Sequence, residues 1–179
     1  MTIEHFSDEH FFLSNFSRLA VTWRDEVWPT SEHAFQAAKC VEEMDRLSIL
    51  YADSPGQAKR LGRKVKLRPD WDEIKDGIMD EILAAKFATH HMQDRLLATG
   101  EEELIEGNNW HDQYWGDCSC ENADGVHPDC LTPGRNRLGA ALMILRGEIR
   151  ARRARIEEEE QTTPGEVLPH RTMESGGAA

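Results

Sequence analysis

The chain has 179 residues, of which 39% are hydrophobic and 30% charged, and its formal net charge is −12. This length supports one hydrophobic core and is too short for two comfortable domains. No apolar run approaches the roughly 18 residues of a spanning helix, and the acidic, aromatic N-terminus is unlike a signal peptide. We therefore expect a cytoplasmic protein without membrane contact, and the acidic balance argues against bulk electrostatic binding to nucleic acid.

Only short strands are expected. They are predicted at residues 3–6 and 103–106, and in a hairpin over residues 19–27, where apolar and polar residues alternate around a turn at Arg24-Asp25. Most of the remaining chain, as far as residue 150, is predicted to be helical. The sequence therefore predicts a helix-dominated α+β fold in a single domain, with a few short strands.

The helices are predicted from N-terminal capping residues and from apolar residues at i+4 spacing. One long helix is expected to begin at an Asp70 capping box and to reach about residue 90, and a final core helix begins after Asn136. The shorter helices are expected at residues 30–41, 43–51, 55–61 and 94–99.

The helix expected at residues 30–41 follows a Trp-Pro step, with Thr30 or Ser31 as its N-cap. Residues four and seven positions apart share a helix face, so this helix presents a carboxylate, an amide and an amine in one direction, beside an aromatic ring. These residues are Glu32, Gln36, Lys39 and Phe35, backed by a stripe of alanines. The alternative interpretation is a solvent-exposed pattern of charges.

Residues 106–116 combine two Trp, one Tyr, two Asn and two carboxylates between glycines typical of a loop. A pocket for a planar or sugar-bearing ligand needs rings to stack on and an acid to handle protons or positive charge. The candidates here are Trp110, Asp112, Tyr114, Trp115 and Gly116. The alternative is an aromatic turn that only fills a small core.

Six cations without an intervening acid lie at residues 59–68, on and after a short helix with a Ser54 capping box and Gly62 as a plausible C-cap. They are Lys59, Arg60, Arg63, Lys64, Lys66 and Arg68. Such a patch could steer a pyrophosphate or a nucleic-acid backbone toward a pocket. A solvated basic surface is the alternative.

Three cysteines and a histidine form a Cys-x-Cys-x6-His-x2-Cys pattern: Cys118, Cys120, His127 and Cys130. This donor set matches a structural tetrahedral zinc site, although the spacing is not that of a standard zinc finger or ribbon. Free thiols or one disulfide are the alternatives, and the lack of a secretion signal disfavours the disulfide.

Together with Phe-Leu-Ser-Asn-Phe at 12–16, Ala-Lys-Phe at 85–87 and Gly-Arg-Asn-Arg-Leu-Gly at 134–139, the segments at 28–39 and 106–116 resemble the NADAR (YbiA-like) family over about residues 4–147. The resemblance implies an N-glycosidase domain at residues 1–150 that cleaves a ribose–nitrogen bond. The substrate class it implies is ADP-ribose joined to guanine in nucleic acid, or alternatively phosphoribosylamino intermediates of riboflavin biosynthesis. A non-catalytic ADP-ribose- or NAD-binding module is the other alternative.

Within this hypothesis, Glu32 and Asp112 handle charge and protons, and no cofactor is required for catalysis. If the helix face is desolvated, Lys39 becomes a nucleophile; its alternative role is an ion pair that only shapes the pocket. Lys86 is a weaker candidate, because its neighbours look like core packing. An ADP-ribose-containing or phosphoribosyl ligand, including ADP-ribosylated DNA or RNA, would contact Asn15, Phe16, Trp28, Phe35, Gln36, Trp110, Tyr114, Trp115, Gly116 and Asn136.

Residues 151–179 differ in character from the rest of the chain. An Arg-rich stretch runs into consecutive glutamates and then into a segment rich in Thr, Pro and Gly. Such a composition cannot bury enough apolar surface to offset the entropy lost on ordering. We therefore expect a frayed helix followed by a disordered charged tail.

Overall fold

Helices dominate the part of the chain that the computed structural model describes, residues 1–122 and 125–162. The α-helices are α1 (Ser31–Ala37), α2 (Glu43–Leu50), α3 (Pro55–Gly62), α4 (Trp71–Lys86), α5 (His90–Leu97) and α6 (Arg137–Thr162). Two short 3-10 helices, η1 (Asp8–Leu13) and η2 (Pro128–Cys130), complete the helical content of the described residues. The predicted fold class, a helix-dominated α+β domain, is confirmed.

The strands are only two or three residues long. The antiparallel hairpin of β2 (Val21–Trp23) and β3 (Glu26–Trp28) turns at Arg24 and Asp25, as predicted, and both have left-handed φ angles, 50° and 62°. β1 (Thr2–Ile3) pairs in parallel with β4 (Glu103–Leu104), and β5 (Gly107–Asn108) with β6 (Asp117–Cys118). β7 (Glu121–Asn122) and β8 (Gly125–Val126) form a second hairpin.

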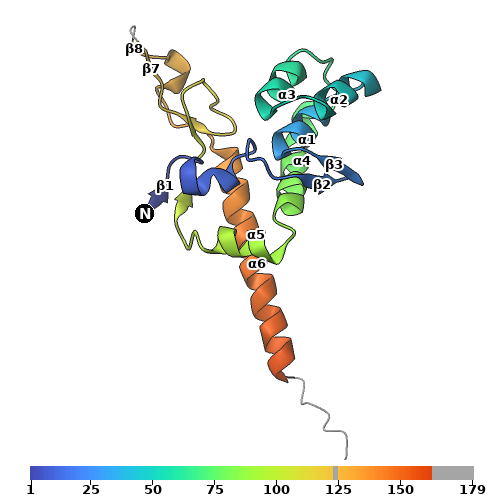
Figure 1. The fold of residues 1–179 in the computed structure, drawn as a ribbon. Helices are drawn as coiled ribbons and strands as arrows, with labels where there is room; N and C mark the ends of the chain where they lie inside the picture. The colour runs from blue at the N-terminus through green and yellow to red at the C-terminus, as the bar shows by residue number, and fades with distance from the viewer. Residues whose placement is uncertain (123–124, 163–179) are drawn as a thin grey trace, which may run out of the picture.

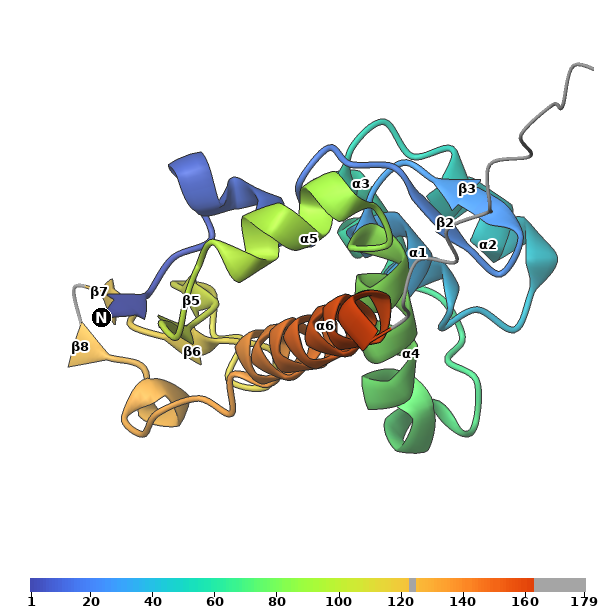
Figure 2. The ribbon, with the colours of Figure 1, turned by 90° about the horizontal axis from the view of Figure 1, so that it is seen from below.

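Helix α4 lies at the centre of the fold and contacts α1, β2 and α6. The short helices α1, α2 and α3 gather around one end of it, and α5 packs against α6 (Figures 1 and 2). The core between these elements contains fully buried Trp28, Ile82, Phe87 and Leu142. This core supports one wall of the site described below, and the segments at residues 5–16 and 106–116 supply the other walls.

Several local expectations were wrong. The helix expected at residues 30–41 ends at Ala37, because the amides of Lys39 and Cys40 bond to carbonyls three residues back and form a turn. The helix expected at residues 94–99 begins earlier and spans His90–Leu97. The helix predicted to reach residue 90 ends at Lys86, because a new helix begins at His90 with the Thr89 hydroxyl accepting a hydrogen bond from the Met92 amide. The side chain of Asp70 does not cap α4, since both of its carboxylate oxygens accept hydrogen bonds from Arg68. Gly62 is the last residue of α3 and not its C-cap.

Helix α6 continues through residue 150 to Thr162, and Arg153 anchors this extension to α5 by hydrogen bonds to Gln93 and Asp94. The tail expected to be disordered beyond residue 162 lies outside the described residues. In the described part of the chain, none of the helices has the length and apolar character that crossing a membrane would take.

Candidate active site

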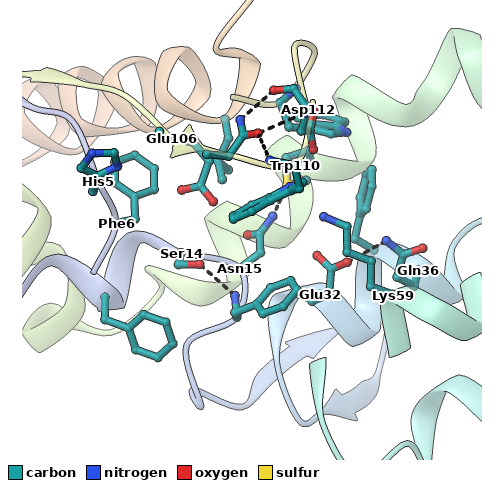
Figure 3. A pocket seen from close by; sticks show the side chains of 18 of the residues that line it. His5, Phe6, Ser14, Asn15, Glu32, Gln36, Lys59, Glu106, Trp110 and Asp112 are labelled. Carbon is teal, nitrogen blue, oxygen red and sulfur yellow. Dashed lines mark hydrogen bonds between the residues drawn. The ribbon is translucent and has the colours of Figure 1, made fainter. Parts of the chain in front are cut away.

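A cavity of about 550 Å³ opens between the N-terminal segment, α1, α3 and the loop at residues 106–116 (Figure 3). The structure brings together in its lining most of the residues proposed from the sequence. These are Asn15, Phe16, Glu32, Phe35, Gln36, Lys39, Trp110, Asp112 and Trp115. The polar face of α1 is therefore directed into a cavity, and the alternative of a solvent-exposed charge pattern is wrong.

Glu32 and Gln36 of α1 form one hydrogen-bonded row with Lys39, which lies in the turn after the helix. Gln36 Nε2 donates to Glu32 Oε1 over 2.7 Å, and Lys39 Nζ donates to Gln36 Oε1 over 2.6 Å. The helix starts as the sequence predicts, because Thr30 accepts a hydrogen bond from the amide of His33. Gln36 thus holds the carboxylate and the amine at a fixed separation along the cavity floor.

Burial shifts the two ends of this row in opposite directions. The side chain of Glu32 is buried, and burial raises its pKa against the opposing effects of Lys59, the Gln36 hydrogen bond and Lys39. Burial likewise lowers the pKa of Lys39, against the attraction of Glu32. Both shifts favour the neutral form of the group, which is the form that a general acid or an amine nucleophile needs.

Lys59 is the cation that faces the buried carboxylate, although the sequence indicated only a basic cluster. Its Nζ lies 5.6 Å from the centre of the Phe16 ring and 5.5 Å from that of Trp110, within cation–π range. Arg63 also lines the cavity, whereas Arg68 pairs with Asp70 and the other three cations of the cluster are exposed. The cluster thus divides into a cavity-facing pair and a peripheral set.

Glu106 lines the cavity opposite α1, and the sequence did not single it out (Figure 3). Burial raises its pKa to about 7, opposed by the positive charges of Lys59 and Lys86. The residue was visible in the sequence only as the first position of the aromatic loop. Its placement depends on the pairing of β5 with β6, which no local pattern encodes.

The carboxylate of Asp112 faces the cavity and also holds the aromatic loop in shape. Its Oδ1 accepts hydrogen bonds from the amides of Tyr114, at 3.3 Å, and Trp115, at 2.9 Å. Asn108, another lining residue that the sequence did not single out, donates to the Asp112 carbonyl and accepts from the amides of Trp110 and Asp112. Asp112 is therefore already engaged by backbone amides, whereas the Glu32 carboxylate accepts a hydrogen bond from the Gln36 side chain.

Asn15 presents an unused acceptor to the cavity. Its Nδ2 donates to the sulfur of Met79 at 3.4 Å, but its buried Oδ1 has no hydrogen-bond partner within residues 1–122 and 125–162. A buried acceptor without a partner is costly unless a ligand or water satisfies it.

Lys86 holds the backbone next to Asn15 in place, because its buried amine donates to the carbonyls of Leu13 and Ser14. Burial lowers the pKa of that amine to about 7.

The remaining proposed ligand contacts lie outside the cavity lining. Trp28 is buried in the core and donates to the carbonyl of Trp23, and the hydroxyl of Tyr114 donates to Asp76. A Cβ on Gly116 would overlap the Glu106 carbonyl, so this glycine allows a close backbone approach. Asn136 donates to the Leu104 carbonyl and accepts from the Glu106 amide, so it positions Glu106 and does not face a ligand.

The predicted metal cluster is present with a different histidine. The sulfur atoms of Cys118, Cys120 and Cys130 and a ring nitrogen of His111 all lie within 4.8 Å of one another. His127, predicted from the spacing, stacks on the ring of His111 at 4.2 Å and accepts a hydrogen bond from the Asp129 amide. The sequence spacing was misleading because His111 precedes the cysteines and reaches them only through the folded loop.

The sequence of this chain is similar to those of known proteins. The NADAR domain family model matches residues 3–150. The N-glycosidase YbiA of Escherichia coli strain K12 is 38% identical over 146 residues, 80% of this chain and 84% of that protein. An N-glycosidase of Nostoc punctiforme is 40% identical over 143 residues, 76% of this chain and 84% of that protein.

Two further matches extend the comparison. A riboflavin biosynthesis protein of Vibrio vulnificus is 36% identical over 145 residues, 79% of this chain and 36% of that protein. The NMR structure of E. coli YbiA superimposes with a TM-score of 0.68 and 33% identity, covering 94% of this chain and 90% of that one. The cavity and its polar helix face therefore lie within a matched domain, and the chain belongs to the NADAR domain family.

Proposed function

We propose that this chain is an N-glycoside hydrolase that breaks a ribose–nitrogen bond and removes ADP-ribose from a modified guanine base in nucleic acid. The observation that carries the proposal is the buried carboxylate of Glu32, which Gln36 links to Lys39 and which Lys59 faces across an aromatic cavity. The relatives named as N-glycosidases support the reaction class.

Cleavage of a ribose–nitrogen bond makes two demands that this cavity can meet. As the C1′–N bond breaks, its electron pair leaves with the nitrogen, which must gain a proton, while positive charge builds on the sugar. Glu32 or Glu106, each with its pKa raised by burial, would supply the proton. The resulting carboxylate then stabilises the cationic sugar, and water adds to C1′ and releases a proton.

Lys39 offers a covalent route to the same products. Its neutral amine would attack C1′ and form a C–N bond as the bond to the base breaks, and the amine then loses a proton. Opening of the ribose ring gives a Schiff base, which water hydrolyses to free ADP-ribose and the original lysine. The lowered pKa of Lys39 and the fixed direction of its amine support this route.

The base, the ribose and the pyrophosphate of the proposed substrate each have complementary side chains in the cavity. The Phe16 and Trp110 rings provide flat surfaces for a base, and Lys59 and Arg63 provide positive charge for a pyrophosphate. The Asn15 Oδ1, which has no hydrogen-bond partner in the described part of the chain, would accept a hydrogen bond from a ribose hydroxyl. Unmodified nucleic acid offers no ADP-ribose for these groups, so recognition would depend on the modification.

The activity is tested with a DNA oligonucleotide that carries ADP-ribosylated guanine, by chromatography of released ADP-ribose. We expect release by the native protein and a loss of about 10²-fold or more in turnover for Glu32→Gln, the usual scale for such a group. Glu73→Gln, at an exposed position on α4, serves as the control and should keep full activity. Equal rates for Glu32→Gln and the native protein, at matched circular dichroism, would remove the proposed role of Glu32.

The covalent route is tested by adding borohydride during turnover. If Lys39 is the nucleophile, mass spectrometry will find a reduced ADP-ribose adduct on this residue. Lys39→Arg keeps the charge and removes the reactive amine, so it should be nearly inactive, whereas Lys66→Arg at an exposed position should not change the rate. Substantial activity of Lys39→Arg without any trapped adduct would favour direct attack by water.

A second candidate function follows from the relatives named as riboflavin biosynthesis proteins in Vibrio vulnificus and Zea mays. In this reaction the protein would hydrolyse the ribose–nitrogen bond of a phosphoribosylamino intermediate with the same residues. The same assay with such intermediates distinguishes the two substrates by which base or amine is released. Binding of ADP-ribose without release from any substrate would instead indicate a non-catalytic module.

A further inference from the structure

We propose that His111, Cys118, Cys120 and Cys130 bind one structural zinc ion, and that this ion fixes the cavity wall formed by Trp110 and Asp112. Three thiolates and one imidazole are a donor set typical of closed, tetrahedral zinc sites. The three cysteine side chains are buried and form a small cluster of their own, separate from the main core.

Two distances between donor atoms are close to the value that a tetrahedral ion requires. His111 Nδ1 lies 3.4 Å from the sulfur of Cys120 and 3.4 Å from that of Cys130. Zinc–sulfur and zinc–nitrogen bonds of usual length, meeting at the tetrahedral angle, place nitrogen and sulfur about 3.6 Å apart. All four donor atoms lie within 4.8 Å of one another, so one ion can contact every donor with small adjustments.

The backbone at His111 provides an independent observation. This residue has a φ of 66°, in the left-handed region that residues with a Cβ rarely adopt. A conformation of this kind persists only when the surrounding structure fixes it, and it often marks a functional site. Here it turns the ring toward the three sulfur atoms, with His127 stacked behind it at 4.2 Å.

The metal ligands are joined directly to the cavity wall. His111 lies between Trp110 and Asp112 in the chain, and both neighbours line the cavity. Cys118 in β6 is paired with Asn108 in β5, which in turn holds the backbone of residues 110 and 112. The ion would therefore connect the loop at His111 to β6 at Cys118. Its binding free energy would contribute to the folding of this wall.

The ligand assignment is tested by elemental analysis of the full-length protein purified under reducing conditions. We expect about one zinc per chain in the native protein and in His127→Ala, and a marked loss in His111→Ala. His111→Cys, which keeps four soft donors, should retain the metal even if His111→Ala folds poorly. Metal-free native protein, a disulfide within the cluster, or loss of zinc from His127→Ala but not from His111→Ala would overturn the assignment.

Replacement of the native metal by Co²⁺ gives a second measurement. A tetrahedral site with three thiolates should show sulfur-to-cobalt charge-transfer absorption and intense visible bands, in the native protein and in His127→Ala alike. Octahedral cobalt spectra would contradict the proposed geometry.

The effect on the cavity is tested by amide hydrogen exchange before and after a chelator removes the metal. Exchange at residues 107–118 should increase, while the buried part of α4 stays protected. Unchanged exchange at residues 107–118 would refute the link between the metal and the cavity wall. None of these measurements uses a substrate, so their result is independent of the proposed hydrolase activity.

Discussion

Glu106 is partly buried beside the cavity, and this burial raises its pKa to about 7 from an ordinary value of 4.5. Between these two pH values the folded protein keeps a proton that the unfolded chain has released. This proton stabilises the fold fully below about pH 4.5, and the contribution is lost as the pH rises through about 7. The burial that makes Glu106 a candidate acid therefore also makes stability depend on pH.

Glu106→Gln should remove this part of the pH dependence. We expect the free energy of unfolding of the native protein, relative to the variant, to fall by up to a few kcal/mol from pH 4.5 to above pH 7. Urea denaturation at a series of pH values measures the difference. Glu103→Gln, at an exposed position on β4, should keep the native slope, and an identical slope in Glu106→Gln would contradict the burial argument.

A second buried group, Lys86, interacts with Glu106 but changes the stability in a different pH range. Lys86 has a pKa lowered to about 7 from 10.5, so the unfolded chain holds more protons only between these values. Its effect makes stability rise with pH above about 7, opposite in sign to the Glu106 effect and in a different pH range.

The sequence indicated some of these residues and could not indicate others. Glu32 and Gln36 share a face of α1, so their common direction follows from helical periodicity. Lys39 lies in the turn after α1, and its hydrogen bond to Gln36 brings it into line with them. Lys59 and Glu106 reach the same cavity only because α3 packs against α1 and because β5 pairs with β6. Their roles depend on tertiary packing, which a charge pattern along the chain does not contain.

At the level of elements, the close approach of α3 to α1 determines the shape of the cavity floor. Gly62, at the end of α3, faces the side chain of Gln36, and a Cβ there would lie 2.9 Å from Gln36 Cβ and Cδ and closer still to its Oε1. The C-cap interpretation from the sequence was wrong, because α3 includes Gly62 and its C-cap is Arg63; the glycine instead makes room for Gln36. Gln36 in turn joins Glu32 to Lys39.

Gly62→Ala should therefore displace Gln36. We expect a destabilisation of about 1–3 kcal/mol, typical of overpacking, and a loss of activity because the link between Glu32 and Lys39 is broken. Gly77→Ala is the matched control, since nothing lies within 4 Å of a Cβ at this exposed helical position. The control should gain roughly 0.5–1 kcal/mol from helix propensity alone. Chemical denaturation compares the variants, and a stabilised Gly62→Ala protein would refute the packing argument.

Sequence patterns predicted the turns and helix caps that depend on residues close together in the chain. The hairpin turn at Arg24 and Asp25 and the cap at Ser54 were predicted where the structure has them. The paired strands β1 and β4 differ, because their residues are separated by about a hundred positions and each strand is two residues long. Only the assembled fold defines such strands, so the sequence could give no more than approximate positions for them.

The whole molecule combines an acidic chain with a locally basic cavity. Its net charge is −12, yet Lys39, Lys59 and Arg63 all line the cavity around the buried Glu32. Net charge governs long-range behaviour, whereas a ligand in the cavity responds to the charges that line it. The global balance therefore does not decide whether the cavity accepts a phosphate-bearing ligand.

The two ends of the described chain differ in their distance from the cavity, and this affects how the protein can be tagged or fused. Ile3 is buried in β1, and His5 and Phe6 already line the cavity, so any domain fused ahead of Met1 would start beside its wall. Helix α6 begins at the cavity with Leu138 and carries the chain away over roughly 35 Å to Thr162 (Figure 1). Affinity tags, surface tethers and reporter domains should therefore be attached beyond α6, where they leave substrate access open.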